Sequence, residues 1–145
     1  MVVKMKKKKI PRYQDRRRYV VLRMVGKNLD PDKITNLLKL YPSSAQPSAN
    51  IKRKFKKIYN TRYGHWTLDS RLKRNSTLQN QVKDIYQQIK PKRKILKKIL
   101  KNIKADLNIS VQPHEKLVYV AYMFPAKIIN EFTSLGIDIR FSVYI

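Results

Sequence analysis

Cations interleaved with aromatic residues are the part of this chain whose types and spacing suggest chemistry. Segment 51–64 contains six Lys or Arg residues, and Phe55, Tyr59 and Tyr63 recur in it every four residues. This pattern suits a nucleic acid, because basic side chains neutralise phosphates while aromatic rings stack on unpaired bases. It equally fits a short amphipathic helix or strand whose aromatic rings face the core, so both interpretations stay open at this point.

Two further segments are strongly basic. Residues 1–18 carry nine Lys or Arg residues and one acid, which predicts a flexible arm that binds a polyanion, or else only a solubilising tail. Residues 92–104 place Leu96 and Ile99 on one side of a predicted helix and Lys97 towards the other. Such a helix is compatible with a solvated basic face, a phosphate-binding face or a membrane surface, and its lack of Trp and Phe argues against the membrane.

These segments together define the residues that we expect to contact nucleic acid. Lysine outnumbers arginine in them, which favours point-charge contact with phosphates over bidentate reading of bases and predicts weak sequence preference. The expected residues are Lys6, Lys7, Lys8, Lys9, Arg12, Arg16, Arg17, Arg18, Lys52, Arg53, Lys54, Lys56, Lys57, Tyr59, Arg62, Tyr63, Lys94, Lys97, Lys98 and Lys101.

A catalytic site is not predicted. The two histidines, His65 and His114, do not have the spacing of metal ligands, and the three glycines do not form a phosphate-binding loop. His65 and Asp69 would share one face of a strand, but about 13 Å apart, which is too far for a direct hydrogen bond. We therefore expect a protein that is not an enzyme and uses neither a metal nor a cofactor.

The composition indicates a negatively charged partner. The 145 residues carry a net charge of +25, which is more than solubility requires and favours a polyanionic partner. Nucleic acid comes first, followed by an anionic membrane and an acidic protein. The chain has no cysteine, which fits a reducing compartment such as the cytoplasm. An apolar run long enough to span a membrane is absent from the sequence, and no secretory signal is expected.

The C-terminal residues 105–145 are expected to form the organising part of the fold. Apolar and polar residues alternate over 107–111, as in a strand with one buried face. The run 117–124 is apolar throughout, which predicts a central strand covered on both sides. Pro125 then opens a helix that ends at Gly136, and alternation resumes over 137–145.

The preceding residues predict further elements. A strand over 19–25 is followed by a helix with Asp30 as its N-cap, a buried stripe that extends to Tyr41, and a stop at Pro42. Residues 42–50 read as a loop, and 65–70 as a short strand in which Trp66 packs in the core. Ser76 and Gln79 have the spacing of a capping box that opens a helix, and Pro91 separates this helix from the basic one.

The prediction is an α+β protein with a single antiparallel-rich sheet and helices on one face, in the order βαβ-αα-ββαβ. Residues 1–18 form the arm and residues 19–145 a single domain. The block 105–145 has a net charge of −1 and the rest of the chain +26, so the excess charge lies outside the expected core.

The ordered motifs resemble a known family. They are the helix start Gly26-x-x-Leu29-Asp30-Pro31, the strand Trp66–Ser70 and the C-terminal segment Leu135–Tyr144. Over residues 19–145 the chain is similar to the bacterial domain-of-unknown-function family DUF4279. The resemblance implies a small α+β domain and carries neither an activity nor catalytic residues. Members are associated with defence and toxin-immunity gene neighbourhoods, which is analogy alone.

The leading hypothesis is a non-enzymatic nucleic-acid-binding protein, associated with RNA or a ribonucleoprotein, that acts mainly through phosphate contacts. The alternative is an immunity or inhibitor protein that covers an acidic partner protein.

Overall fold

A computed structural model describes residues 17–48, 63–113 and 121–144. The elements are β1 (Arg17–Gly26), α1 (Pro31–Leu38), β2 (Ser44–Gln46), β3 (Gly64–Asp69), α2 (Leu78–Ile89), a 3-10 turn (Lys90–Lys92), α3 (Arg93–Ile99), β4 (Lys104–Gln112), α4 (Ala126–Thr133) and β5 (Ile137–Val143).

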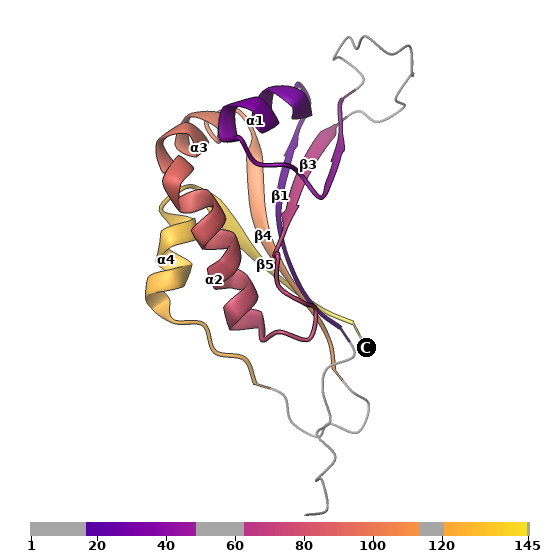
Figure 1. The fold of residues 1–145 in the computed structure, drawn as a ribbon, viewed down its shortest axis with the longest axis vertical. Helices are drawn as coiled ribbons and strands as arrows, with labels where there is room; N and C mark the ends of the chain where they lie inside the picture. The colour runs from indigo at the N-terminus through magenta and orange to yellow at the C-terminus, as the bar shows by residue number, and fades with distance from the viewer. Residues whose placement is uncertain (1–16, 49–62, 114–120, 145) are drawn as a thin grey trace, which may run out of the picture.

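The strands form one five-stranded sheet in the order β2-β3-β1-β4-β5. Strand β1 is central, since it pairs antiparallel with both β3 and β4, while β5 joins the edge of β4 in parallel. The helices lie on one face of this sheet (Figure 1). The predicted α+β class, the antiparallel-rich sheet and the single helical layer are therefore confirmed.

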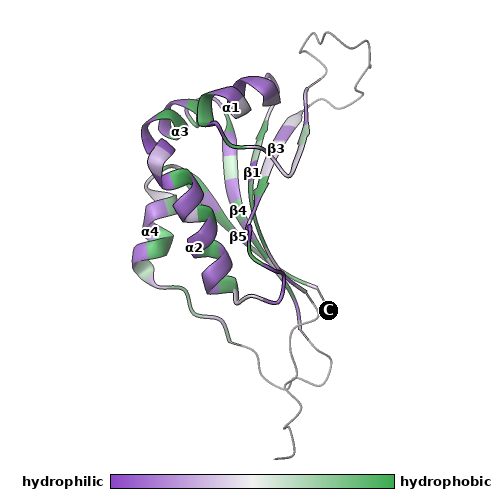
Figure 2. Cartoon of the chain, viewed as in Figure 1, coloured by the Kyte–Doolittle hydropathy of each residue, from purple (hydrophilic) through white to green (hydrophobic). Residues whose placement is uncertain are grey.

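Alternation along the strands determines the core. The residues of β1 that face the helices, Val20, Leu22 and Met24, are fully buried, and Leu22 lies between Leu68 of β3 and Leu107 of β4. Trp66 is also fully buried, as predicted, and its indole Nε1 donates to Thr35 Oγ1 on α1 over 3.1 Å. Figure 2 shows hydrophobic and hydrophilic residues interspersed along the helices, as amphipathic packing on one sheet face requires.

Helix α1 begins as predicted and ends earlier. The carboxylate of Asp30 accepts hydrogen bonds from the backbone of Asp32 and Lys33, and Pro31 occupies the first turn. The helix stops at Leu38 because Lys39 adopts a left-handed conformation with φ 52°. The predicted extension to a buried Tyr41 is therefore wrong, and Tyr41 is 88% exposed.

Helices α2 and α3 are separated at Pro91, as predicted. The N-cap of α2 is Thr77, one residue after the predicted Ser76, and its hydroxyl accepts from the backbone N–H of Asn80. Helix α3 buries Leu96 on the core and ends at Ile99. The predicted helix up to residue 104 is too long, because Lys104 already belongs to β4.

The predicted central strand 117–124 is wrong over its described part. Residues 121–124 have no regular secondary structure, and residues 117–120 lie outside the described residues. Tyr122 and Phe124 pack against the core while Met123 between them is 80% exposed. The outer edge of β4 is instead occupied by β5, which also requires the long crossover through α4.

Two smaller differences concern strand boundaries. Residues 44–46, predicted as loop, form β2 against β3, where the hydroxyl of Thr67 donates to the carbonyl of Ser44. Strand β1 begins at Arg17, so Arg17 and Arg18 belong to the sheet rather than to the predicted arm. Helix α4 ends at Thr133 with Ser134 as its C-cap, three residues before the predicted end at Gly136, and Gly136 instead forms the turn into β5 with φ +83°.

Candidate nucleic-acid interface

Four lysines form a basic ridge on α3 and the turn after it. The α3 ridge consists of Lys94, Lys97, Lys98 and Lys101, all of which are exposed. At about 100° per residue, their positions fall within an arc of about 100° around the helix axis. Lys101 continues this turn, because its backbone N–H donates to the carbonyl of Lys98 over 3.4 Å. Leu96 on the opposite side anchors the helix in the core, so the ridge points away from it.

The ridge has no compensating acid within the part of the chain that the structure describes. The nearest basic residue with a partner is Arg93, whose Nη1 lies 3.6 Å from Oε2 of Glu131 on α4. Lysines at spacings of three and four residues repel one another, at about 0.2–0.5 kcal/mol per pair. The free chain therefore carries an unfavourable term here that a bound polyanion would relieve.

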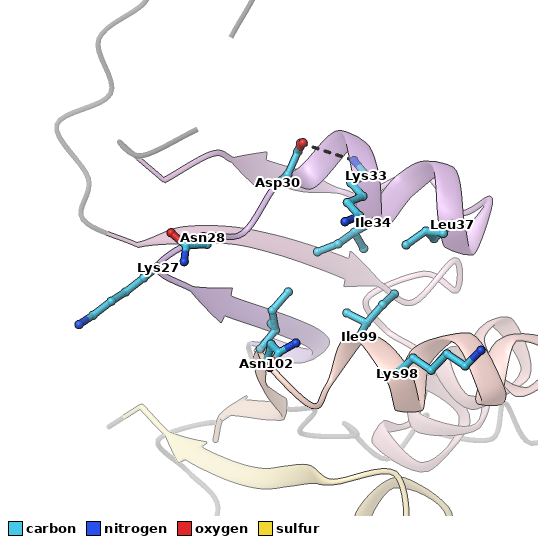
Figure 3. Close-up of a pocket in the computed structure, with 10 residues that line it drawn as sticks. Lys27, Asn28, Asp30, Lys33, Ile34, Leu37, Lys98, Ile99 and Asn102 are labelled. Atoms are coloured by element: carbon cyan, nitrogen blue, oxygen red, sulfur yellow. Dashed lines mark hydrogen bonds between the residues drawn. The ribbon is translucent and has the colours of Figure 1, made fainter. Parts of the chain in front are cut away.

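A groove separates α3 from α1. Its cavity volume is about 520 Å³, and its walls are Ile34 and Leu37 of α1 opposite Ile99 of α3 and Ile103, which lies just before β4. Figure 3 shows Ile34 and Leu37 across the opening from Ile99. Leu37 falls within the buried stripe that the sequence predicts for this helix, but it is 42% exposed and lines the groove.

Basic and amide side chains surround the apolar walls. Lys33 belongs to α1, Lys98 to α3, and Lys27 with Asn28 to the turn between β1 and α1, while Asn102 lies beyond α3. Lys98 therefore belongs both to the α3 ridge and to the groove. Sequence reasoning missed Lys27, Asn28, Lys33 and Asn102, because the groove is made by two helices far apart in the chain.

A smaller hollow flanks α3 on its other side. It has a volume of about 350 Å³ and is lined by Arg93, Lys94 and Lys97 together with Ser134 and Leu135 beyond the end of α4. The ridge therefore stands between two hollows that both carry lysine side chains.

The base of the β2–β3 hairpin lies beside the groove. A Cβ built on Gly64 would lie 2.7 Å from the backbone nitrogen of Ser48 and 2.9 Å from the carbonyl oxygen of Leu29, just before α1. Ser48 and Tyr63 are the described residues that bracket segment 49–62. The predicted residues Lys52, Arg53, Lys54, Lys56, Lys57, Tyr59 and Arg62, and the aromatic Phe55, lie outside the described residues. Tyr63, in contrast, is described and is 47% exposed.

The arm joins the sheet at its other end. Arg17 pairs with Gln112, whereas Gly26 at the opposite end of β1 pairs with Gly64. The guanidinium of Arg18 donates to the backbone carbonyl of Asn75 over 2.5 Å, so it supports the loop before α2. The other predicted arm residues, Lys6, Lys7, Lys8, Lys9, Arg12 and Arg16, lie outside the described residues. The described basic residues thus do not form one continuous site.

His65 and Asp69 on β3 form hydrogen bonds to two different partners. His65 Nε2 lies 3.1 Å from the hydroxyl of Ser44, and the carboxylate of Asp69 accepts from the hydroxyl of Tyr19 over 2.6 Å. Among the described residues, no cluster of three or more His, Cys, Asp or Glu side chains is placed to hold a metal ion.

Asp84 on α2 is a structural carboxylate. Its Oδ1 accepts from Nε and Nη2 of Arg71 over 3.1 and 2.8 Å, and its Oδ2 accepts from the backbone of Arg71, from Ser70 and from Gln88. Burial raises the pKa of Asp84, but the hydrogen bonds and charge of Arg71 outweigh it and hold the pKa below its usual value. This network fixes the loop after β3.

The comparisons with known proteins agree with this architecture. Residues 16–145 match the family described as Domain of unknown function (DUF4279). The chain belongs to this family. Neither a curated protein nor a solved structure matches the chain. Among the described residues of this DUF4279 protein, the helices are too short or too polar to cross a membrane.

Proposed function

We propose that this DUF4279 protein is a non-enzymatic RNA-binding protein that holds its ligand mainly through phosphate contacts. The observation that carries the proposal is the α3 ridge, where Lys94, Lys97, Lys98 and Lys101 point outward within one arc and face no acid among the described residues. A face that served only solubility would not need to concentrate one sign of charge at this cost to the helix.

The ridge has the dimensions of a short phosphate track. From Lys94 to Lys101 the helical rise is about 10 Å, which is long enough to face two successive phosphates of one strand. Lysine ammonium groups act as point charges on the phosphates. They therefore contribute to affinity but discriminate little between base sequences. The protein then binds RNA in the cytoplasm with weak sequence preference.

The test compares two variants of the full chain that lose the same charge. The ridge variant is K94Q/K97Q/K98Q/K101Q, and the matched control, K39Q/K73Q/K83Q/K127Q, removes four exposed lysines from other elements. Fluorescence anisotropy with a single-stranded RNA measures affinity across a salt series. We expect the ridge variant to lower the log–log salt slope by at least about 1.4, since each of two lost contacts with a single strand contributes about 0.7. The control should keep a slope close to that of the wild type.

Equal slopes for the ridge variant and the control would overturn the proposal. They would mean that the ridge lysines affect binding only through the net charge of the protein, as any four surface lysines would. A second test is affinity capture of the protein's partners from the native host, with and without nuclease. Recovery of RNA that nuclease releases supports the proposal, whereas recovery of only an acidic protein that nuclease does not release would contradict it.

A further inference from the structure

The α1–α3 groove has apolar walls that suit the faces of an unpaired base, which a row of lysines does not provide. Its walls are the aliphatic side chains of Ile34, Leu37, Ile99 and Ile103, and its volume of about 520 Å³ lies within the range of about 300–1,000 Å³ that is usual for small-molecule sites. Water held against these side chains is released when a flat apolar surface replaces it. The faces of a nucleobase are such a surface.

The polar residues of the groove match the edge of a base. Asn28 and Asn102 bring carboxamide groups to the groove, and a carboxamide both donates and accepts, as the edges of bases do. A groove that bound only an alkyl chain would not need the exposed carboxamide of Asn102 in its lining. An amphipathic helix would need a row of apolar positions over several turns, whereas α1 has only 8 residues and α3 only 7.

The charges connect the groove to the ridge. Lys98 contributes to both, and Lys33 belongs to the opposite wall on α1. Among the described residues that line the groove the one acid is Asp30, and its carboxylate caps α1 by accepting from the backbone N–H groups of Asp32 and Lys33. Figure 3 shows Lys98 next to Ile99 on the α3 side of the groove, so a phosphate bound by Lys98 would bring the adjoining base close to the groove.

We propose that the α1–α3 groove receives one unpaired nucleobase of the RNA strand that the α3 ridge holds, which makes single-stranded RNA the preferred ligand. This inference rests on the proposed function. A base within a duplex is stacked and paired and does not enter the groove, so the groove discriminates single strands from duplexes while the ridge binds both.

The experiment removes the groove contacts without a change in charge. The groove variant is L37A/N102A, and the matched control is L72A/N80A, in which Leu72 has an exposure of 41% against 42% for Leu37 and both asparagines are exposed. Both variants should retain the wild-type melting temperature to within a few degrees, because none of the four side chains is buried. The ligands are a single-stranded RNA and a duplex RNA of equal phosphate number.

We expect the groove variant to bind the single strand about fivefold more weakly, at the lower end of the range for one base contact, and the duplex with less than about a twofold change. The control should change neither affinity by more than about twofold. A groove variant that matches the control on both ligands overturns this inference and leaves the proposed function intact. A wild type that binds neither ligand overturns the proposed function itself.

Crosslinking gives a second, independent test of the groove. A single strand that contains 4-thiouridine is irradiated on the wild-type full chain, and the modified peptides are identified by mass spectrometry. We expect crosslinks within residues 27–37 and 98–103, which line the groove. Crosslinks confined to other parts of the chain would overturn the assignment of the groove.

Discussion

Gly64 and Leu29 meet where the β2–β3 hairpin passes the start of α1. A Cβ on Gly64 would lie 2.9 Å from the carbonyl oxygen of Leu29, and equally close to the carbonyl oxygen of Gln46. Both atoms belong to the backbone, which cannot move aside as a flexible side chain can. Close approach of three backbone segments thus fixes the hairpin base against the turn that supplies Lys27 and Asn28 to the groove.

Gly64→Ala should therefore destabilise the protein by about 2–3 kcal/mol, as expected for a close contact that forces backbone shifts. Gly26→Ala is the matched control, since a Cβ there would meet Ile103 Cγ1 at 3.4 Å and needs little adjustment. Urea denaturation followed by far-UV circular dichroism measures both variants. A Gly64→Ala variant as stable as Gly26→Ala would show that the backbones separate easily.

The indole of Trp66 gives a prediction within the core. Its Nε1 donates to the hydroxyl of Thr35 over 3.1 Å, and the side chain is fully buried. Thr35→Val keeps the shape but leaves this donor without a partner, which should lower the free energy of unfolding by about 1–3 kcal/mol. Thr35→Ser retains a hydroxyl and should lose less. Chemical denaturation monitored by the fluorescence of this single tryptophan measures both, and equal losses would contradict the role of the hydrogen bond.

Asp84 gives a prediction for pH. Its pKa in the folded protein is depressed below its ordinary value, so its contribution to stability is fully present above a pH of about 4 and is lost as the pH falls through the folded pKa. Asp84→Asn removes the charge that Arg71 pairs with and should cost about 2–3 kcal/mol at neutral pH. Thermal melts between neutral and acidic pH should converge for wild type and variant. A difference that persists undiminished in acid would rule out this ionisation as the cause.

The sequence predicted the elements that have strong local signals. The N-cap Asp30 with Pro31, the break at Pro91 and the turn at Gly136 each depend on a few neighbouring residues, and the structure confirms them. The candidate site was predictable only for the lysines of α3, because their spacing is also local. The groove required knowledge that α1 packs beside α3, which no local pattern contains.

The errors in the fold have the opposite origin. The apolar run before Phe124 looks like a central strand, but β5 pairs with the edge of β4 and leaves no place for it there. The run Ser44–Gln46 contains none of the β-branched or aromatic residues that favour strands, yet it pairs with β3, where Gly64 allows the backbones to approach. Both outcomes depend on contacts between distant parts of the chain.

The location of the arm leads to the last prediction. Strand β1 begins at Arg17 and ends at Gly26, so the arm joins the sheet about 30 Å from the end where Gly26 pairs with Gly64. Deletion of residues 1–16 leaves β1 and the hydrogen bond of Arg18 to Asn75 in place, so the melting temperature should remain nearly unchanged. The deletion should flatten the salt dependence of RNA binding by about 0.7 in log–log slope for each phosphate contact that it removes.

The arm joins the sheet at the end of β1 opposite to Gly26, so we expect the deletion and K94Q/K97Q/K98Q/K101Q to affect RNA binding independently. Their losses in binding free energy should then add to within about 0.5 kcal/mol in the combined variant. Anisotropy titrations of the wild type, each variant and the combination on one long single strand provide this double-mutant cycle. Additivity fits an RNA that contacts the two ends of the protein independently. A combined loss no greater than that of one variant would mean that the arm and the ridge hold the same phosphates, and would contradict their separation along β1.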